Sequence, residues 1–259
     1  MSLIKNRIKQ LEIKFATLVA PPPYSHEYRL QIDFNPAGLQ IDFQINYTER
    51  EQLSEEEILE EGFTLEDDFT WKGKLPKAWK PALIDMLAQT NTLRTKQAPD
   101  SQNLIELLVK YDESDPQEGI PENAENWEYF IQEVIQAIYE LGQKERPLEI
   151  RYVVKDKKTT QTIRVDPKFS HRSLKVTKEQ NGRKEVRSLE WEELMPLLQA
   201  VYLPDYNPEK AKEKLPNKPG KYIDHGEGLW YEMGQAVSNP SKKVDAIGRL
   251  HTLLLSYFN

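Results

Sequence analysis

The most regular alternation of apolar and polar residues lies in the first fifth of the chain, in two arms separated by turn residues. The alternation runs from Leu30 to Phe34 and resumes from Leu39 to Tyr47 after the turn residues 35–38. Period-two alternation on both sides of a turn is typical of a half-buried antiparallel hairpin. Another alternating stretch, Leu11 to Val19, precedes this hairpin and is separated from it by a segment that contains three consecutive prolines. The sequence therefore predicts three consecutive strands here.

A similar series recurs in the second half of the chain. The second series begins with Leu148-Glu149-Ile150, and the first begins with the same residue types, Leu11-Glu12-Ile13. Asn181-Gly182 is a typical hairpin turn within the second series. The expected strands are 148–154, 160–165, 174–177 and 185–187, and a fourth strand of the first series is expected within 63–71. The recurrence of an ordered series of elements indicates internal duplication.

Each series then ends in a predicted helix. Apolar residues recur at helical spacing after Pro76 (Trp79, Leu83, Met86 and Leu87) and after Ser188 (Leu194, Leu197, Leu198, Val201 and Tyr202). Pro81 and Pro196 fall at matching places inside these helices. Because an interior proline removes a helix hydrogen bond, its presence in both copies favours shared descent.

These patterns predict an α+β protein with two related antiparallel-sheet-plus-helix units. Between them we expect an insert with a strand or short helix at 104–111 and an amphipathic helix from Trp127 to Leu141; a helical tail follows, with a helix from Pro240 to Phe258. The expected segments are 1–95 (first unit), 96–143 (insert), 144–203 (second, basic unit), 204–220 (a linker rich in proline and lysine) and 221–259 (a tail that packs on the body).

Composition narrows the class of protein. The chain has 259 residues, of which 38% are hydrophobic and 30% charged, which is typical of a globular protein with a wet surface. It has no cysteine, so no disulfide, thiolate metal site or cysteine nucleophile is possible. Charges interrupt the apolar residues of 1–7, and no apolar run approaches the ~20 residues of a membrane span. We expect a cytoplasmic protein that is not embedded in a membrane.

The net charge of −7 hides an uneven distribution. Residues 144–187 hold 14 basic and 6 acidic residues, a net charge of +8, whereas residues 49–68 hold 10 acids against Arg50 alone, a net charge of −9. The acidic stretch is either a binding lobe for a basic partner or a solvated, poorly ordered loop.

The basic stretch likewise has two interpretations. It can follow a nucleic-acid backbone, with Tyr152 or Phe169 stacking on bases, or it can be the solvent-facing side of the strands. Used twice, a unit of four strands and a helix is similar in general plan to the PUR and Whirly nucleic-acid-binding folds. The candidate nucleic-acid-binding residues are Arg151, Lys155, Lys157, Arg164, Lys168, Arg172 and Lys175.

Few residues suggest catalysis. The four histidines (His26, His171, His225 and His251) show no zinc-binding spacing, and no phosphate-binding loop or nucleophile elbow is present, so no metal or cofactor is expected. Asp224-His225-Gly226-Glu227-Gly228 combines an acid, a base and flexible backbone, as an active-site loop would, or is a glycine-rich turn. Asp33 and Asp42 are expected as diagonal neighbours on the polar face of the first hairpin, each opposite a glutamine.

The sequence therefore favours a non-catalytic protein-binding or scaffold module with a protein partner. Two alternatives stay open. One is a single-stranded nucleic-acid-binding protein that uses the basic residues of 144–187, and the other is a hydrolase-like enzyme centred on residues 224–228.

Overall fold

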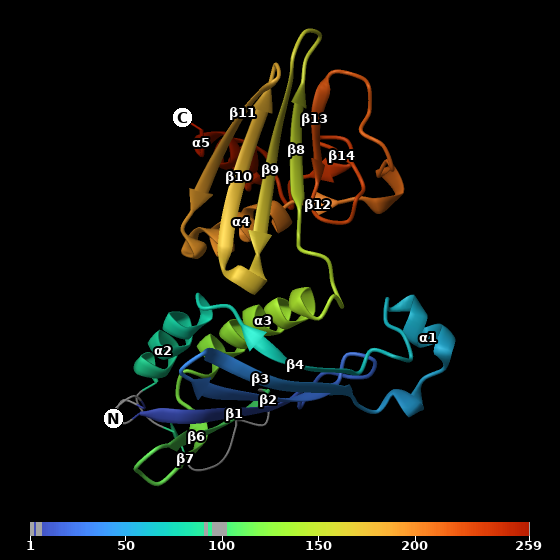
Figure 1. The fold of residues 1–259 in the computed structure, drawn as a ribbon. Coiled ribbons are helices and arrows are strands. Elements are labelled where there is room, and N and C mark those ends of the chain that lie inside the picture. The colour runs from blue at the N-terminus through green and yellow to red at the C-terminus, as the bar shows by residue number, and fades with distance from the viewer. Residues whose placement is uncertain (1–2, 4–6, 91–92, 95–102, 259) are drawn as a thin grey trace. The chain divides into compact units, whose positions relative to one another are not determined.

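The chain forms two compact units, each an antiparallel sheet with helices on one face. The computed structural model describes residue 3 and residues 7–90, 93–94 and 103–258. The units comprise Met1–Glu145 and Arg146–Asn259, and Figure 1 shows the elements of each. Antiparallel sheets with segregated helices confirm the α+β class.

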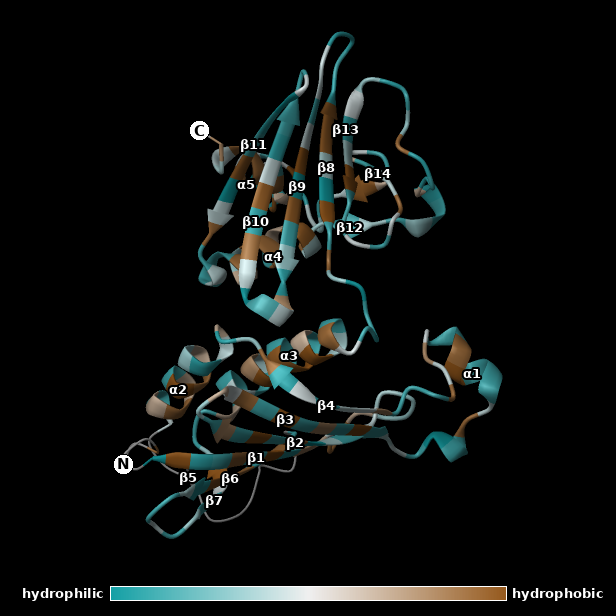
Figure 2. Cartoon of the chain, viewed as in Figure 1, coloured by the Kyte–Doolittle hydropathy of each residue, from teal (hydrophilic) through white to brown (hydrophobic). Residues whose placement is uncertain are grey.

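The sheet of the first unit has seven strands in the order β4-β3-β2-β1-β6-β7-β5. The strands are β1 (Ile8–Ala16), β2 (His26–Asn35), β3 (Gly38–Tyr47), β4 (Phe69–Leu75), β5 (Leu93–Arg94), β6 (Leu104–Tyr111) and β7 (Gln117–Pro121). Asn35 pairs with Gly38, so the β2–β3 turn has two central residues. The register confirms the predicted hairpin, and buried positions alternate with more exposed ones along both strands. Figure 2 shows the hydropathy of the residues in these strands.

Two helices cover one face of this sheet, α2 (Trp79–Gln89) and α3 (Ala124–Leu141). A short helix, α1 (Glu55–Glu60), and a 3-10 turn, Arg50–Gln52, lie between β3 and β4. The rings of Trp79 and Phe130 meet edge to face at 5.9 Å, and Trp127 Nε1 donates to Thr90 Oγ1 at 2.9 Å. These contacts join α2 to α3 over the sheet.

The segment expected as an insert at 96–143 belongs, over its described residues 103–143, to the first unit. Its strand β6 pairs along its whole length with β1, and β7 pairs with β6. Ile105, Leu107 and Val109 are buried on alternate positions because β6 lies inside the sheet. Residues 95–102 lie outside the described residues.

The sheet of the second unit has six strands in the order β11-β10-β9-β8-β13-β14. They are β8 (Ile150–Lys155), β9 (Thr160–Lys168), β10 (Ser173–Gln180), β11 (Arg183–Leu189), β13 (Gly220–Asp224) and β14 (Tyr231–Glu232). A separate pair is formed by β12 (Asp205–Tyr206) and β15 (Val237–Ser238). Helices α4 (Leu194–Tyr202) and α5 (Ala246–Ser256) and 3-10 turns at Phe169–His171, Trp191–Glu193 and Pro208–Lys210 complete the unit.

The core of the second unit lies between the sheet and the two helices. Buried residues of the strands (Ile150, Tyr152, Ile163, Val165, Leu174 and Val176) pack against Leu194, Leu197 and Val201 of α4 and Leu250 and Leu254 of α5. Asp245 caps α5 by accepting a hydrogen bond from Gly248 N at 2.9 Å. This cap starts the helix at Ala246, six residues after the predicted start at Pro240.

The expected linker at 204–220 is instead packed against the sheet. Leu215 contacts a small cluster made by Val153, Tyr222 and Trp230 on the face opposite the helices. Lys155 Nζ donates to Asn217 Oδ1 at 2.7 Å, which fixes the segment over the end of β8. The following residues 221–224 belong to a strand, so the expected helical tail is helical only in α5.

The two units share a strand order. Reading each sheet from β4 and from β11, the orders β4-β3-β2-β1-β6-β7 and β11-β10-β9-β8-β13-β14 correspond strand for strand. The helix after the fourth strand carries its proline at the third residue in both units, Pro81 in α2 and Pro196 in α4. Both prolines therefore lie in a first turn, where the backbone N–H has no partner inside the helix, and not at an interior kink as expected.

Candidate functional site

The loop between β13 and β14 contains the predicted acid-base residues. Asp224 is 1% exposed, and its Oδ1 accepts the N–H groups of Gly226 at 3.0 Å and Gly228 at 2.9 Å. Its Oδ2 accepts from Arg151 Nη2 at 2.5 Å. The carboxylate therefore uses both oxygens to hold the loop closed around itself, which leaves it no free oxygen for proton transfer to a substrate.

His225 is enclosed by aromatic rings. Its ring centroid lies 4.3 Å from that of Tyr206 and 5.0 Å from that of Tyr231. Its buried Nε2 has no hydrogen-bond partner among the described residues, and the nearest carboxylate oxygen, Oε2 of Glu227, is 3.9 Å away. This arrangement is that of a packed aromatic cluster.

The tyrosines of this cluster are held protonated. Burial and the hydrogen bond to Glu227 raise the pKa of Tyr231 to about 12. Burial also raises the pKa of Tyr202, whose hydroxyl donates to the carbonyl of His225 at 2.8 Å. A phenol with a raised pKa is a poor nucleophile at neutral pH, so the cluster stabilises the loop more readily than it activates a substrate.

Acidic partners engage two of the three arginines predicted to bind nucleic acid. Arg151 pairs with Asp224 and lies 4.9 Å from the centroid of Trp230. Arg164 Nε pairs with Asp166 Oδ2 at 2.9 Å on the same strand. Within the described part of the second unit, these pairs reduce the positive charge that the sheet presents.

The other predicted basic residues lie at different places on the sheet. Lys157 is in the β8–β9 turn, whereas Lys168 and Arg172 are at the far end of β9, about 30 Å away at the rise of an extended strand. Arg172 lies over the ring of Trp191 at 5.5 Å, and Lys175 is exposed on β10 opposite Asp166. The fold therefore brings Arg151 and Arg164 opposite each other on β8 and β9 but leaves Lys157 at one end of β9 and Lys168 and Arg172 at the other.

The proposed stacking residues are both engaged in the protein interior. Tyr152 is 1% exposed, and its hydroxyl lies 2.8 Å from His251 Nδ1. Phe169 packs edge to face on Trp191 at 5.1 Å. The ring of Tyr152 is therefore closed to a base, whereas Phe169 is half-buried.

The acidic lobe, residues 49–68, is an ordered structure built around Arg50. Arg50 Nη1 donates to the carbonyl of Thr64 at 2.6 Å and to Asp67 Oδ2 at 2.9 Å. Its guanidinium also lies 4.0 Å above the ring of Tyr47 and 4.9 Å from that of Phe63. One cation thus satisfies the backbone and an acid of the lobe while it packs on two aromatic rings.

Helix α1 gives the lobe its second support. Ser54 and Glu57 form a reciprocal capping box at its start, and hydrogen bonds from the Ser54 backbone and side chain lower the pKa of Glu57. Ile58 is buried beneath the helix. Partial burial opposes the ionisation of Asp67, but hydrogen bonds from Thr64 and Arg50 outweigh it and hold the pKa of Asp67 below its usual value.

The outer side of the lobe combines acids with exposed apolar residues. Leu59 is 53% exposed, and Leu65 is 60% exposed. A shallow hollow of about 560 Å³ is lined by Glu55, Glu56, Leu59 and Glu60. Exposed apolar residues ringed by charge are typical of protein interaction sites.

The β1–β2 connection, residues 17–25, adjoins the lobe and adds further exposed apolar residues, Leu18 and Val19. Arg50 Nε donates to the carbonyl of Pro23 at 3.3 Å, and Tyr24 Oη donates a short hydrogen bond to Glu61. The connection and the acidic lobe therefore form one surface. The sequence analysis did not predict that the acidic lobe is ordered. Two signals could have indicated it: the single basic residue, Arg50, and the three-residue spacing from Ser54 to Glu57 that suits a helix cap.

The polar face of the first sheet is paired within itself. Asp33 lies opposite Gln40 and Asp42 opposite Gln31, as predicted. Asp33 Oδ1 accepts from Gln10 Nε2 at 2.6 Å, and Asp42 pairs with Lys72 at 2.8 Å. The two carboxylates are therefore separate members of cross-strand pairs and not a joint acid-base site.

No protein-family model, no curated protein and no solved structure matches the chain. None of the helices in the described residues combines the length and apolar character needed to cross a membrane.

Proposed function

We propose that the protein is a non-catalytic protein-binding module whose acidic lobe contacts a basic partner. The observation that carries the proposal is the fixing of the lobe by Arg50, because it presents carboxylates and leucines in one preformed arrangement. A preformed surface loses less conformational entropy on binding than a disordered acidic loop does.

The chemistry of the lobe defines the partner. Leu59 lies in a hollow among Glu55, Glu56 and Glu60, so it suits a partner segment in which an apolar side chain lies between lysines or arginines. The charge pairs at the rim steer association, and the apolar contact adds affinity that salt weakens less.

Site-specific photo-crosslinking in cells tests the proposal. A photoreactive residue at position 59 or 65 is expected to give an adduct with a partner protein. Replacing Val186, which is also exposed but lies on β11, provides the control. Reversal of charge at Glu55, Glu56 and Glu60 is expected to remove the adduct. Equal yields of adduct from positions 59 and 186 would contradict the proposal. An adduct at position 59 that persists after the charge reversal would contradict it as well.

Single-stranded nucleic-acid binding is the second candidate, supported by the net charge of +8 over residues 144–187. Fluorescence anisotropy with labelled single-stranded DNA and RNA at two salt concentrations tests it. We expect weak binding, because Arg151 and Arg164 are paired with acids. Micromolar affinity that collapses with salt and falls in a Lys168→Gln, Lys175→Gln variant would establish the second function instead.

A hydrolase function has less support. Asp224 is bound by backbone N–H groups and Arg151, and His225 faces tyrosine rings, so the three residues of the loop do not converge on an open space. Loss of a hydrolytic activity in a His225→Asn variant that keeps its fold would reverse this ranking.

We also infer that the two units arose by internal duplication. The shared strand order and the matching prolines Pro81 and Pro196 support this origin. An experimental structure in which β1–β4 and β8–β11 superpose with Pro81 over Pro196 is the expected result. A different strand order, or prolines one turn apart, would contradict it.

We propose a cytoplasmic location, supported by the absence of cysteine from a chain of this size. Cell fractionation checks it. Recovery of the protein in a membrane or extracellular fraction would be the contrary result.

A further inference from the structure

A second surface feature of the first unit lies at the end of the sheet away from the acidic lobe. A cavity of about 370 Å³ lies between the β2–β3 turn and α2. Strands β2 and β3 run from the lobe to this turn, so the two features occupy opposite ends of the same hairpin. The cavity is large enough for a small ligand.

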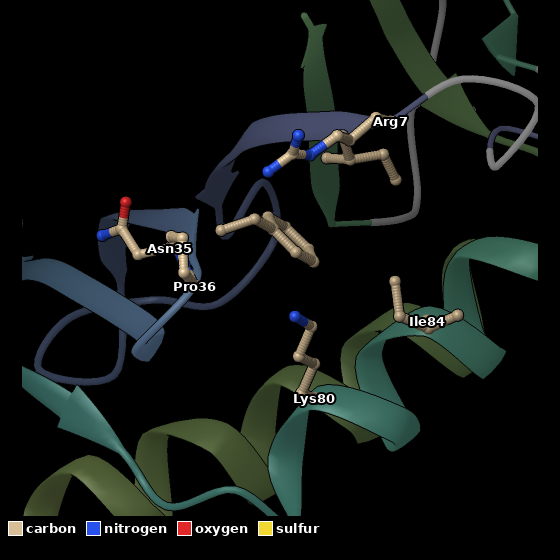
Figure 3. Close-up of a pocket in the computed structure, with 7 residues that line it drawn as sticks. Arg7, Asn35, Pro36, Lys80 and Ile84 are labelled. Atoms are coloured by element: carbon tan, nitrogen blue, oxygen red, sulfur yellow. The ribbon is translucent and has the colours of Figure 1, made fainter.

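The walls of this cavity are mainly apolar. They comprise Ile8, Phe34, Pro36 and Ile84, with Asn35 as a polar neighbour. Figure 3 shows Pro36 and Asn35 on the hairpin side and Ile84 on the helix side of the space. Apolar walls with a few polar groups are the usual lining of a small-molecule site.

Two cations complete the lining. Lys80 projects from α2 toward the strands, and Arg7 reaches in from the start of β1 (Figure 3). Arg7 Nε pairs with Asp112 at 3.2 Å, which leaves its terminal nitrogens available. Among the described residues, no hydrogen bond or ion pair engages Lys80 Nζ.

No acid is among the residues that line the cavity, and the first turn of α2 contains none. The positive end of the helix therefore adds to the charge of Lys80, while Asp112 neutralises part of the charge of Arg7. A negative group is favoured here, and an apolar body beside it would cover Phe34 and Ile84.

We propose that this cavity binds a small organic carboxylate with an apolar or aromatic body. Lys80 and Arg7 bind the carboxylate through charge-assisted hydrogen bonds. Phe34, Pro36 and Ile84 contact the body. The same chemistry is offered by a free small molecule and by the C-terminal carboxylate of a peptide, and the cavity volume favours the free molecule. This site is independent of the protein-binding role of the lobe.

Two-dimensional ¹H–¹⁵N NMR of the full chain tests the proposal with 4-phenylbutyrate as the probe. We expect saturable shifts at the amides of Asn35 and Ile84, and none with the uncharged amide of the same acid. Lys80→Gln is expected to weaken binding about tenfold, as for the loss of one charge-assisted hydrogen bond. Lys77→Gln is the matched control, because Lys77 is exposed on the same segment but does not line the cavity.

Each outcome of this experiment is decisive. A phenylalanine-terminated tripeptide that binds more tightly than 4-phenylbutyrate at the same amides supports the site and assigns it to a chain terminus. The proposal is overturned by equal affinity for acid and amide, or by equal effects of the Lys80 and Lys77 variants. It is also overturned by the absence of saturable shifts up to about 10 mM probe, beyond the weak end of small-ligand affinity.

Discussion

Arg50 and Asp67 form an ion pair of 2.9 Å that closes the acidic lobe, with Arg50 12% and Asp67 18% exposed at their side chains. The pair joins the beginning of the lobe to its end across 17 residues of sequence. An arginine in this position does more than neutralise one acid, since it also donates to the backbone at Thr64 and Pro23.

Replacing Arg50 with methionine, which keeps an unbranched apolar stem and removes the guanidinium, should open the lobe. The loss leaves the carbonyls of Thr64 and Pro23 without this donor and leaves Asp67 with only its hydrogen bonds from Thr64, which is expected to cost about 1 to 3 kcal/mol. Hydrogen-deuterium exchange of residues 54–64 is expected to accelerate by more than tenfold. Arg29→Met is the control, because Arg29 pairs with Glu12 on the open face of the sheet, where an ion pair is worth little. Unchanged exchange in the Arg50 variant would contradict the role assigned to it.

The pH dependence of the lobe follows from Asp67. Its pKa is lower in the folded lobe than in an unfolded chain, so its stabilising contribution is fully present above the unfolded value near 3.9. The contribution is lost as the pH falls through the folded pKa. The stability difference between the wild-type protein and Asp67→Asn, measured by urea unfolding, is therefore expected to be larger at pH 6 than at pH 3. A difference that grows at acid pH would show that the pKa is raised instead.

We expect the carboxylate of Asp224 to stabilise the folded protein. Asp224→Ala leaves two backbone N–H groups and Arg151 without an acceptor, and the loss is expected to cost about 3 kcal/mol or more. Thermal unfolding measures it, with Asp224→Asn intermediate because the amide oxygen still accepts hydrogen bonds. Asp205→Ala, at an exposed acid of the same unit, is the control and should leave the melting temperature unchanged. A fully stable Asp224→Ala protein would show that the loop closes without this carboxylate.

The same loop requires glycine at position 226. Gly226 has a φ of +120°, and a Cβ there would lie 2.5 Å from Leu148 Cδ1. Gly226→Ala is expected to destabilise the protein by about 1 to 3 kcal/mol, through backbone strain together with the close contact to Leu148, and by more than Gly228→Ala, which carries strain alone. Gly228→Ala is the comparison, since φ is +80° and a Cβ meets no atom within 4 Å. Equal stabilities of the two variants in urea unfolding would contradict this order.

Local patterns predicted the local elements well. The β2–β3 hairpin was found because alternation on both arms and a four-residue turn signal all lie within 18 residues of one another. The pairing of β6 with β1 was missed because about ninety residues separate the strands, and no local pattern encodes the partner. Strand β13 was missed because only Tyr222 and Ile223 are apolar between a lysine-rich segment and a glycine-rich loop.

The candidate site was harder to predict than the fold. A run of acids is ordinarily a solvated loop, and its order here depends on contacts between Arg50 and residues on both sides of the run. The basic residues of 144–187 are easily counted, but their pairing with Asp224 and Asp166 depends on register. Counting charges therefore located the acidic and the basic stretch but not the ion pairs within them.

The outermost strands β4 and β11 make the sheets poor templates for further strands. Lys72 and Lys74 project from β4, and β11 carries Arg183, Lys184 and Arg187 in a strand exposed over nearly its whole length. If a second copy docked edge to edge, these cations would lie next to the same cations of the other copy and repel them. Edge-to-edge growth of the sheets is therefore opposed at β4 and β11, and a partner that approaches these two edges meets charged side chains before it reaches the backbone.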